Sequence, residues 1–178
     1  RNAAVLILNK GKDISYAGCG LPYYVGGVIE KREELVVNTP ESFMALTGAE
    51  VRTGTEAVAL DRARRQVTAV DVGTGETSVY TYDKLVIATG ARPIVPDCEG
   101  IELENIFWMR TPDDAGALRK KVDAGEVKRA VVVGGGLIGL EAAENLSARG
   151  VKTSVIDAAP HILSEMLDAE ISEYLENA

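Results

Sequence analysis

Residues Ala130–Asp157, with the sequence AVVVGGGLIGLEAAENLSARGVKTSVID, decide the fold that we expect for the chain. An apolar run opens the segment and has the length and β-branched content of a buried strand. Residues 137–149 follow with small and apolar side chains at helical spacing, and Gly150 stands where a helix C-cap is expected. Residues 151–156 read as a second strand that ends at Asp157. This order predicts a βαβ unit.

Three glycines complete the spacing G-x-G-x-x-G, which is typical of a dinucleotide site. Gly134 permits the tight turn out of the strand, Gly136 lets a pyrophosphate approach the backbone, and Gly139 allows close packing of helix on strand. Asp157, about twenty residues further on, is expected to accept hydrogen bonds from an adenosine ribose. Its carboxylate repels a 2′-phosphate, which favours NAD over NADP. The alternative is a glycine-rich turn that binds no ligand.

Composition narrows the class of protein. A chain of 178 residues is long enough for one domain or two small ones. Its residues are 46% hydrophobic and 26% charged. A net charge of −8 disfavours nucleic acid and anionic membranes as partners. The chain begins at Arg1 and is expected to be a piece of a longer protein. Cys19 and Cys98 are far apart and match no metal-binding pattern, which indicates a reducing, cytoplasmic setting. Two acidic neighbours disfavour a thiolate at Cys98, so we predict that it is not catalytic.

The most unusual segment is DISYAGCGLPYYVGG at residues 13–27. Glycines flank Cys19 on both sides, so backbone N–H groups can approach its sulfur. Pro22 predicts a helix that begins close to the cysteine, and a helix N-terminus favours a thiolate. Cys19 is therefore a candidate redox or nucleophilic residue. The alternative is a small buried cysteine in a tight turn.

The rest of the chain predicts short strands and helices. Residues 51–82 alternate between apolar and polar side chains with two breaks, which indicates an antiparallel meander inserted into an α/β domain. Residues 85–88 are apolar on both faces, as in a central parallel strand, and lead into Thr89-Gly90. Other expected elements are a strand over 3–8, helices that begin at Thr39-Pro40 and Thr111-Pro112, and a helix over 168–177.

Three segments together resemble a known family: SYAGCGLPYYVGG at 15–27, TYDKLVIATG at 81–90 and GGGLIGLE at 134–141. They are similar to the flavin- and pyridine-nucleotide-dependent disulfide oxidoreductases. The single cysteine before Gly-Leu-Pro-Tyr-Tyr resembles the branch of coenzyme A-disulfide reductase, NADH oxidase and NADH-dependent persulfide or polysulfide reductase. The resemblance implies Rossmann-like units: a partial FAD-binding domain over 1–98 and an incomplete NAD(P)-binding domain over 99–178.

The resemblance also implies a mechanism and a set of site residues. Electrons would pass from NAD(P)H through FAD to Cys19, which would attack a small disulfide, a persulfide or a peroxide. The residues that the resemblance assigns to cofactors are Asn9 and Val58 for the adenosine part of FAD, Thr89 and Gly90 for the FAD site, Ser15 for coenzyme A or the flavin, and Glu141 for the nicotinamide side.

The sequence departs from the family pattern at several places. The family's FAD-binding glycine motif should precede Ala3, and Asn9 replaces the acid that usually closes that unit. Thr47 stands near the position of a lysine that helps hold coenzyme A in some members. A dimerisation domain should follow Ala178, so the parent protein is expected to be a homodimeric enzyme. Two alternatives stay open: an NADH oxidase that reduces oxygen or peroxide, and a non-catalytic NAD-binding module.

Overall fold

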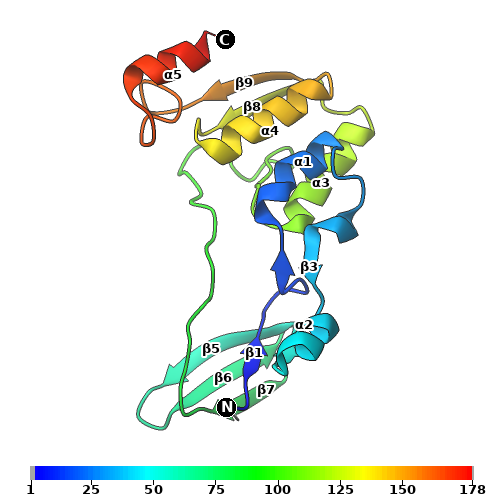
Figure 1. The fold of residues 1–178 in the computed structure, drawn as a ribbon, viewed down its shortest axis with the longest axis vertical. Helices are drawn as coiled ribbons and strands as arrows, with labels where there is room; N and C mark the ends of the chain where they lie inside the picture. The colour runs from blue at the N-terminus through cyan, green and yellow to red at the C-terminus, as the bar shows by residue number, and fades with distance from the viewer. Residues whose placement is uncertain (1–2, 178) are drawn as a thin grey trace. The chain divides into compact units, whose positions relative to one another are not determined.

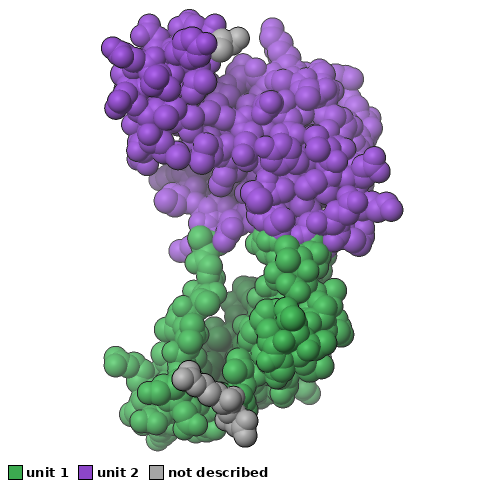
Figure 2. Space-filling view, in the orientation of Figure 1, with its two compact units in different colours: residues 1–16, 36–91 green, residues 17–35, 92–178 purple. Residues whose placement is uncertain are grey.

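The computed structural model describes residues 3–177, which fold into two compact units (Figure 2). The first unit comprises the residues up to Tyr16 together with Val36–Ala91. The second comprises Ala17–Leu35 together with the residues from Arg92 onward. The chain therefore leaves the first unit, contributes a short segment to the second, returns, and then completes the second unit.

This division differs from a single cut between residues 98 and 99. The segment around Cys19 packs with the C-terminal half of the chain, although it lies close to the N-terminus in sequence. A contiguous boundary cannot describe such a segment, because its place is set by packing partners about a hundred residues away. The assignment of one unit to FAD and the other to NAD(P) stays a prediction.

The first unit consists of short strands and one helix. Strands β5, β6 and β7 form the expected antiparallel meander, and β1 pairs with β4 in parallel. Val58 is the extra residue of a bulge, since Ala57 pairs with Ala69 and Ala59 with Thr68. The elements are β1 (Leu6–Leu8), β2 (Ser15–Tyr16), β3 (Val36–Asn38), α2 (Pro40–Thr47), β4 (Glu50–Arg52), β5 (Thr55–Asp61), β6 (Gln66–Asp71) and β7 (Thr77–Thr81).

The second unit contains the βαβ segment that the sequence predicts. Strands β8 and β9 pair in parallel, from Arg129 opposite Lys152 to Val133 opposite Ile156, and α4 lies along them (Figure 1). The elements are the 3₁₀ turns η1 (Gly18–Gly20) and η2 (Arg32–Leu35), the helices α1 (Leu21–Gly26), α3 (Pro112–Asp123), α4 (Leu137–Ala148) and α5 (Ala169–Glu176), and the strands β8 (Arg129–Val133) and β9 (Lys152–Ile156).

The predicted helix starts are confirmed at the level of hydrogen bonds. The Thr39 hydroxyl accepts from the Ser42 N–H at the start of α2, and the Thr111 hydroxyl accepts from the Asp114 N–H at the start of α3. In each helix the side chain of this Ser42 or Asp114 also accepts from the backbone N–H of the threonine, which completes a capping box. Among the described residues, no helix has the length and apolar character needed to cross a membrane.

The predicted central strand over residues 85–88 is wrong. These residues adopt no regular secondary structure, and Val86 and Ile87 are 84% and 70% exposed. An apolar run favours burial, but a strand also needs a partner that completes its backbone hydrogen bonds. No strand within residues 3–177 pairs with this run.

The apolar strand of the βαβ unit is buried on one face only. Ala130 and Val132 pack against the core, whereas Val131 and Val133 are 62% and 75% exposed. The expectation of a fully buried strand is therefore only half correct. Alternate side chains of a strand point to opposite faces, and α4 covers one of them.

The core of the second unit joins α1 to the βαβ segment. Leu21 and Val25 of α1 are 2% and 0% exposed, and they belong to one cluster with residues of α3 and α4 and with the residue just before β9. The other buried members of this cluster are Leu35, Ala115, Leu118, Val122, Leu146 and Val151. The helix that follows Cys19 is thus anchored on the same core as β8 and α4, the strand and helix on either side of the glycine-rich turn.

Close packing of α1 on α4 makes Gly26 sensitive to substitution. A Cβ at Gly26 would overlap the Asn145 side chain, with Asn145 Cβ at 2.9 Å and Cγ at 2.8 Å. Asn145 is buried and its amide donates to the Glu141 carbonyl, so it cannot move away freely. We expect Gly26→Ala to lower the free energy of unfolding by about 1–3 kcal/mol, measured by chemical denaturation.

The matched control is Gly116→Ala in α3, where a Cβ would meet nothing within 4 Å. This change should stabilise the protein by about 0.5–1 kcal/mol, because alanine is a better helix former than glycine. Equal effects of the two substitutions would contradict the close contact between α1 and α4.

Candidate functional site

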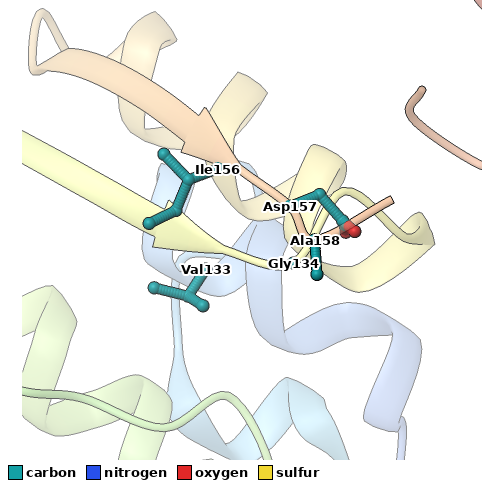
Figure 3. Close-up of a pocket in the computed structure, with 5 residues that line it drawn as sticks. All are labelled: Val133, Gly134, Ile156, Asp157 and Ala158. Atoms are coloured by element: carbon teal, nitrogen blue, oxygen red, sulfur yellow. The ribbon is translucent and has the colours of Figure 1, made fainter. Parts of the chain in front are cut away.

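An open pocket of about 400 Å³ lies at the carboxyl ends of β8 and β9 (Figure 3). Val133, Gly134, Ile156, Asp157 and Ala158 line it. In parallel α/β sheets, ligands bind outside the carboxyl ends of the strands. The pocket therefore lies where the sequence places the dinucleotide site. The sequence singled out Gly134 and Asp157, but it missed the other three residues, which directly flank those two positions.

Each glycine of the motif meets a different requirement. Gly134 has φ of +113°, a conformation that side chains other than glycine rarely adopt. A Cβ at Gly139 would overlap the carbonyl oxygen of Gly134 and come within 3.4 Å of Val132 Cγ1. A Cβ at Gly136 would meet nothing within 4 Å, so the backbone there faces open space. The turn thus combines a tight contact at Gly139 with room for a ligand at Gly136.

Backbone donors hold the Asp157 carboxylate at the edge of this turn. One oxygen accepts from the Ala159 N–H at 2.7 Å, and the other accepts from the Gly135 N–H at 2.5 Å. These bonds, led by the one from Ala159, lower the pKa of Asp157 below its ordinary value. A carboxylate has about four acceptor positions, so lone pairs remain for ribose hydroxyls. The negative charge of the Asp157 carboxylate would repel the 2′-phosphate of NADP.

The loop after β9 folds back onto the glycine-rich turn. The Leu163 N–H donates to the Gly135 carbonyl at 3.0 Å, and Ile162 Cγ2 lies 3.2 Å from the position of a Cβ on Gly135. The Ile162 N–H in turn donates to Glu176 at the end of α5. This bracing was not visible in the sequence, because it joins an irregular loop to a residue fourteen positions away.

Glu141 lies on α4, one turn into the helix that follows the glycines. Its side chain is half-buried, and its carbonyl accepts from the Asn145 amide at 2.8 Å. Glu141 is not among the residues that line the pocket. Its predicted place beside a nicotinamide stays a prediction.

Cys19 is exposed, is in no disulfide, and lies in the η1 turn directly before α1. Its neighbour Gly20 is buried, and a Cβ there would lie 3.0 Å from both Ile29 Cδ1 and Leu35 Cδ2. The sulfur-bearing residue is therefore accessible while the next residue is fixed in the core. The alternative of a buried cysteine in a tight turn is wrong. Cys98 is also exposed and unpaired.

The remaining candidate residues lie in the first unit. Asn9 directly follows β1, and its amide nitrogen donates to the Gly11 and Asp13 carbonyls at 2.8 and 3.3 Å. Any bond from this side chain to a ribose would therefore have to use its oxygen. The other candidates of this unit are Ser15 in β2, Val58 in the bulge of β5, and Thr89 and Gly90 in the extended segment after β7.

Two substitutions in the glycine-rich turn separate ligand binding from folding. Gly136→Ala should change the melting temperature only slightly, because its methyl group projects into open space and the cost is only that of alanine in place of glycine at the N-cap of α4. It should weaken NADH binding at least about tenfold, roughly 1.4 kcal/mol, because that space is where a pyrophosphate would lie. Gly139→Ala should instead lower the melting temperature, because its methyl group overlaps the Gly134 carbonyl.

Fluorescence titration with NADH and thermal unfolding by circular dichroism would measure the two effects. An unchanged NADH affinity in a folded Gly136→Ala variant would rule out a dinucleotide at this turn.

Comparison with known proteins supports the resemblance seen in the sequence. The profile of the pyridine nucleotide-disulphide oxidoreductase family matches residues 1–178. An NADH oxidase of Methanocaldococcus jannaschii is 32% identical over 176 residues, which cover 99% of this chain and 39% of that protein. A coenzyme A disulfide reductase of Staphylococcus haemolyticus is 31% identical over 175 residues, covering 98% and 39%.

Solved structures that superpose on this chain have names of the same kind as these relatives. A NAD-dependent persulfide reductase from A. fulgidus superposes with a TM-score of 0.93 at 36% identity, covering 99% of this chain and 33% of that one. A water-forming NADH oxidase from Lactobacillus brevis, solved with NADH, gives a TM-score of 0.92 at 32% identity, covering 99% and 38%. The chain thus spans about two fifths of the length of the curated relatives it matches. The predicted Rossmann-like α/β fold class is confirmed, and the chain belongs to the pyridine nucleotide-disulphide oxidoreductase family.

Proposed function

We propose that the protein is an FAD-dependent oxidoreductase that uses NAD(P)H to reduce a disulfide, persulfide, polysulfide or coenzyme A disulfide through Cys19. The observation that carries the proposal is the exposed Cys19 in the turn directly before α1, a helix that shares a core with β8 and α4, the strand and helix on either side of the glycine-rich turn. Relatives named coenzyme A disulfide reductase and persulfide reductase support sulfur as the substrate element.

Each of the two cofactors has its own set of proposed residues. The dinucleotide would bind at Gly134–Asp157, with its pyrophosphate at Gly136 and its adenosine ribose at Asp157, while Glu141 faces the nicotinamide. FAD, when bound, would supply a two-electron carrier between the nicotinamide and the cysteine. The residues proposed to hold FAD are Asn9, Val58, Thr89 and Gly90, and Ser15 is proposed to contact coenzyme A or the flavin.

The chemistry at Cys19 is thiol–disulfide exchange. The Cys19 thiolate attacks one sulfur of the substrate, so a Cys19–sulfur bond forms while the substrate S–S bond breaks and the first thiolate leaves. Two electrons from NAD(P)H and a proton then cleave the mixed disulfide, which releases the second thiol and restores Cys19. The exposure of Cys19 fits this role, because the attacking sulfur must reach a substrate in solution.

A second candidate function is reduction of oxygen or peroxide by the same machinery. Two relatives are named NADH oxidase, from Methanocaldococcus jannaschii and Enterococcus faecalis, at 32% and 36% identity. Here Cys19 would cycle through a sulfenic acid instead of a mixed disulfide. Oxygen consumption and thiol release, measured with the same preparation and NADH, separate the two acceptors.

We further propose a homodimer, as the family resemblance implies. We also propose a reducing, cytoplasmic setting, which the free thiols of both cysteines support. Relatives named coenzyme A disulfide reductase and CoA-dependent NAD(P)H sulfur oxidoreductase support coenzyme A as a further ligand. A purified full chain with a flavin absorption spectrum would support the proposal, and a colourless protein that binds NADH would support a non-catalytic NAD-binding module instead.

Replacing the cysteine tests the catalytic assignment. We expect Cys19→Ser to lower NADH-dependent reduction of disulfide or persulfide substrates at least about 100-fold, because the oxygen is a far weaker nucleophile than a thiolate. Stability and NADH affinity should stay unchanged, since residue 19 is exposed. Cys98→Ser is the matched control and should keep full activity. Undiminished reduction by Cys19→Ser in the full chain would refute the proposed function.

The charge of Asp157 tests the coenzyme preference. Asp157→Asn removes the repulsion of a 2′-phosphate and one ionic acceptor for the ribose. The ratio of the NADPH to the NADH dissociation constant should therefore fall at least about tenfold. Asp168→Asn, which makes the same charge change just before α5, should leave the ratio unchanged. An unaltered ratio in Asp157→Asn would place the adenosine ribose elsewhere.

A further inference from the structure

Two arginines meet the C-terminal end of α1, the helix that begins beside Cys19. Arg119 of α3 donates through Nη1 to the Tyr24 carbonyl at 2.9 Å and to the Ile29 carbonyl at 2.6 Å. Arg149, which follows α4, donates to the Val25 carbonyl at 3.5 Å. The last carbonyls of a helix carry partial negative charge and lack partners within the helix. The two guanidinium groups supply those partners.

One carboxylate orients both arginines. Asp123, the last residue of α3, accepts from Arg149 Nη2 at 2.6 Å through one oxygen and from Arg119 Nε at 3.3 Å through the other. The bond from Arg149, followed by that from Arg119, lowers the pKa of Asp123 below its ordinary value. The carboxylate therefore stays charged at neutral pH and fixes the plane of each guanidinium.

The contacts of Arg119 require an arginine. Its side chain is only 17% exposed, and its guanidinium lies 4.5 Å from the centroid of the Tyr24 ring. A buried cation is costly unless its donors are paired. Arg119 pairs its donors with two carbonyls and a carboxylate while stacking on an aromatic face, a combination that the point charge of lysine cannot reproduce.

The residues that Arg119 holds lead directly to Cys19. Arg119 binds the Ile29 carbonyl, and Ile29 Cδ1 lies 3.0 Å from the position of a Cβ on Gly20, the residue next to Cys19. At the other end of this segment, α1 has six residues and no capping side chain at its start. A helix this short is not stable alone, so packing and end contacts decide where it lies.

We propose that Arg119 is a positioning residue for Cys19. Asp123 orients Arg119 as it orients Arg149. Arg119 holds the end of α1 and the Ile29 backbone in place, and so fixes Gly20 and the cysteine beside it. This inference rests on the proposed function for its effect on turnover, but not for its effect on the cysteine itself. Its loss frees the C-terminal end of α1 while Leu21 and Val25 stay in the core.

The test uses the full chain in a Cys98→Ser background, so that Cys19 is the only cysteine among residues 1–178. Arg119→Met removes the guanidinium while keeping an unbranched side chain, and Arg119→Lys keeps the charge. Lys121→Met is the matched control, because Lys121 lies on the same helix and pairs with Glu126 at 2.6 Å on the surface. For each variant we would measure the alkylation rate of Cys19 by iodoacetamide, kcat, the KM for NADH, and the circular dichroism spectrum.

We expect folded Arg119→Met to raise the alkylation rate at least about threefold, because Cys19 is already exposed and a loosened turn lets its sulfur meet the reagent in more orientations. Its kcat should fall at least about tenfold through misplacement of the sulfur, while the KM for NADH changes less than about twofold. Arg119→Lys should restore part of both effects, and Lys121→Met should match the parent.

A folded Arg119→Met variant with the alkylation rate and kcat of the parent would overturn the proposal. Loss of the fold in both Arg119 variants would also overturn it, because the residue would then serve stability alone. Failure of the proposed function can be told apart from failure of this proposal. Full activity of Cys19→Ser would show that Cys19 is not catalytic. The alkylation rate needs no substrate, so it would still decide whether Arg119 positions Cys19.

Discussion

The hydrophobic contact of α1 with α3 and α4 is the constraint on which the second unit depends. Leu21 and Val25 of α1 lie in one cluster with Leu118, Val122 and Leu146. Burial of each such side chain contributes about 1.5–3 kcal/mol, and a six-residue helix has little stability of its own. The cluster therefore holds a segment from near the N-terminus on the βαβ unit. The position of Cys19 thus depends on residues that lie about a hundred positions later in the chain.

The glycine-rich turn combines the close contacts that folding requires with room for a ligand. Gly134 adopts a backbone conformation that favours glycine, and Gly139 leaves no room for a Cβ. Gly136, by contrast, faces open space, and Asp157 is already fixed by backbone donors at the rim. A dinucleotide would find this turn preorganised, because the packing that fixes the turn does not use the space that the phosphates need.

Local patterns were reliable where a few neighbouring residues decide the conformation. The helix starts at Thr39 and Thr111 and the βαβ order could be predicted, since each depends on residues close in sequence. The predicted strand over residues 85–88 and the predicted full burial of the strand that contains Val131 were wrong, because each requires partners that pattern alone does not supply. Apolar character indicates that a residue favours burial, but not whether a neighbour covers it.

The sequence by itself determined the family, the dinucleotide motif with Asp157, and the candidate Cys19, because these are carried by short runs of residues with a fixed spacing. Only the tertiary structure decided that Cys19 lies in the same unit as that motif, and that Arg119 and Arg149 meet the end of its helix. Arg119 bonds to carbonyls 95 and 90 positions away. Backbone carbonyls occur at every residue, so no pattern of side chains could predict which of them a guanidinium reaches.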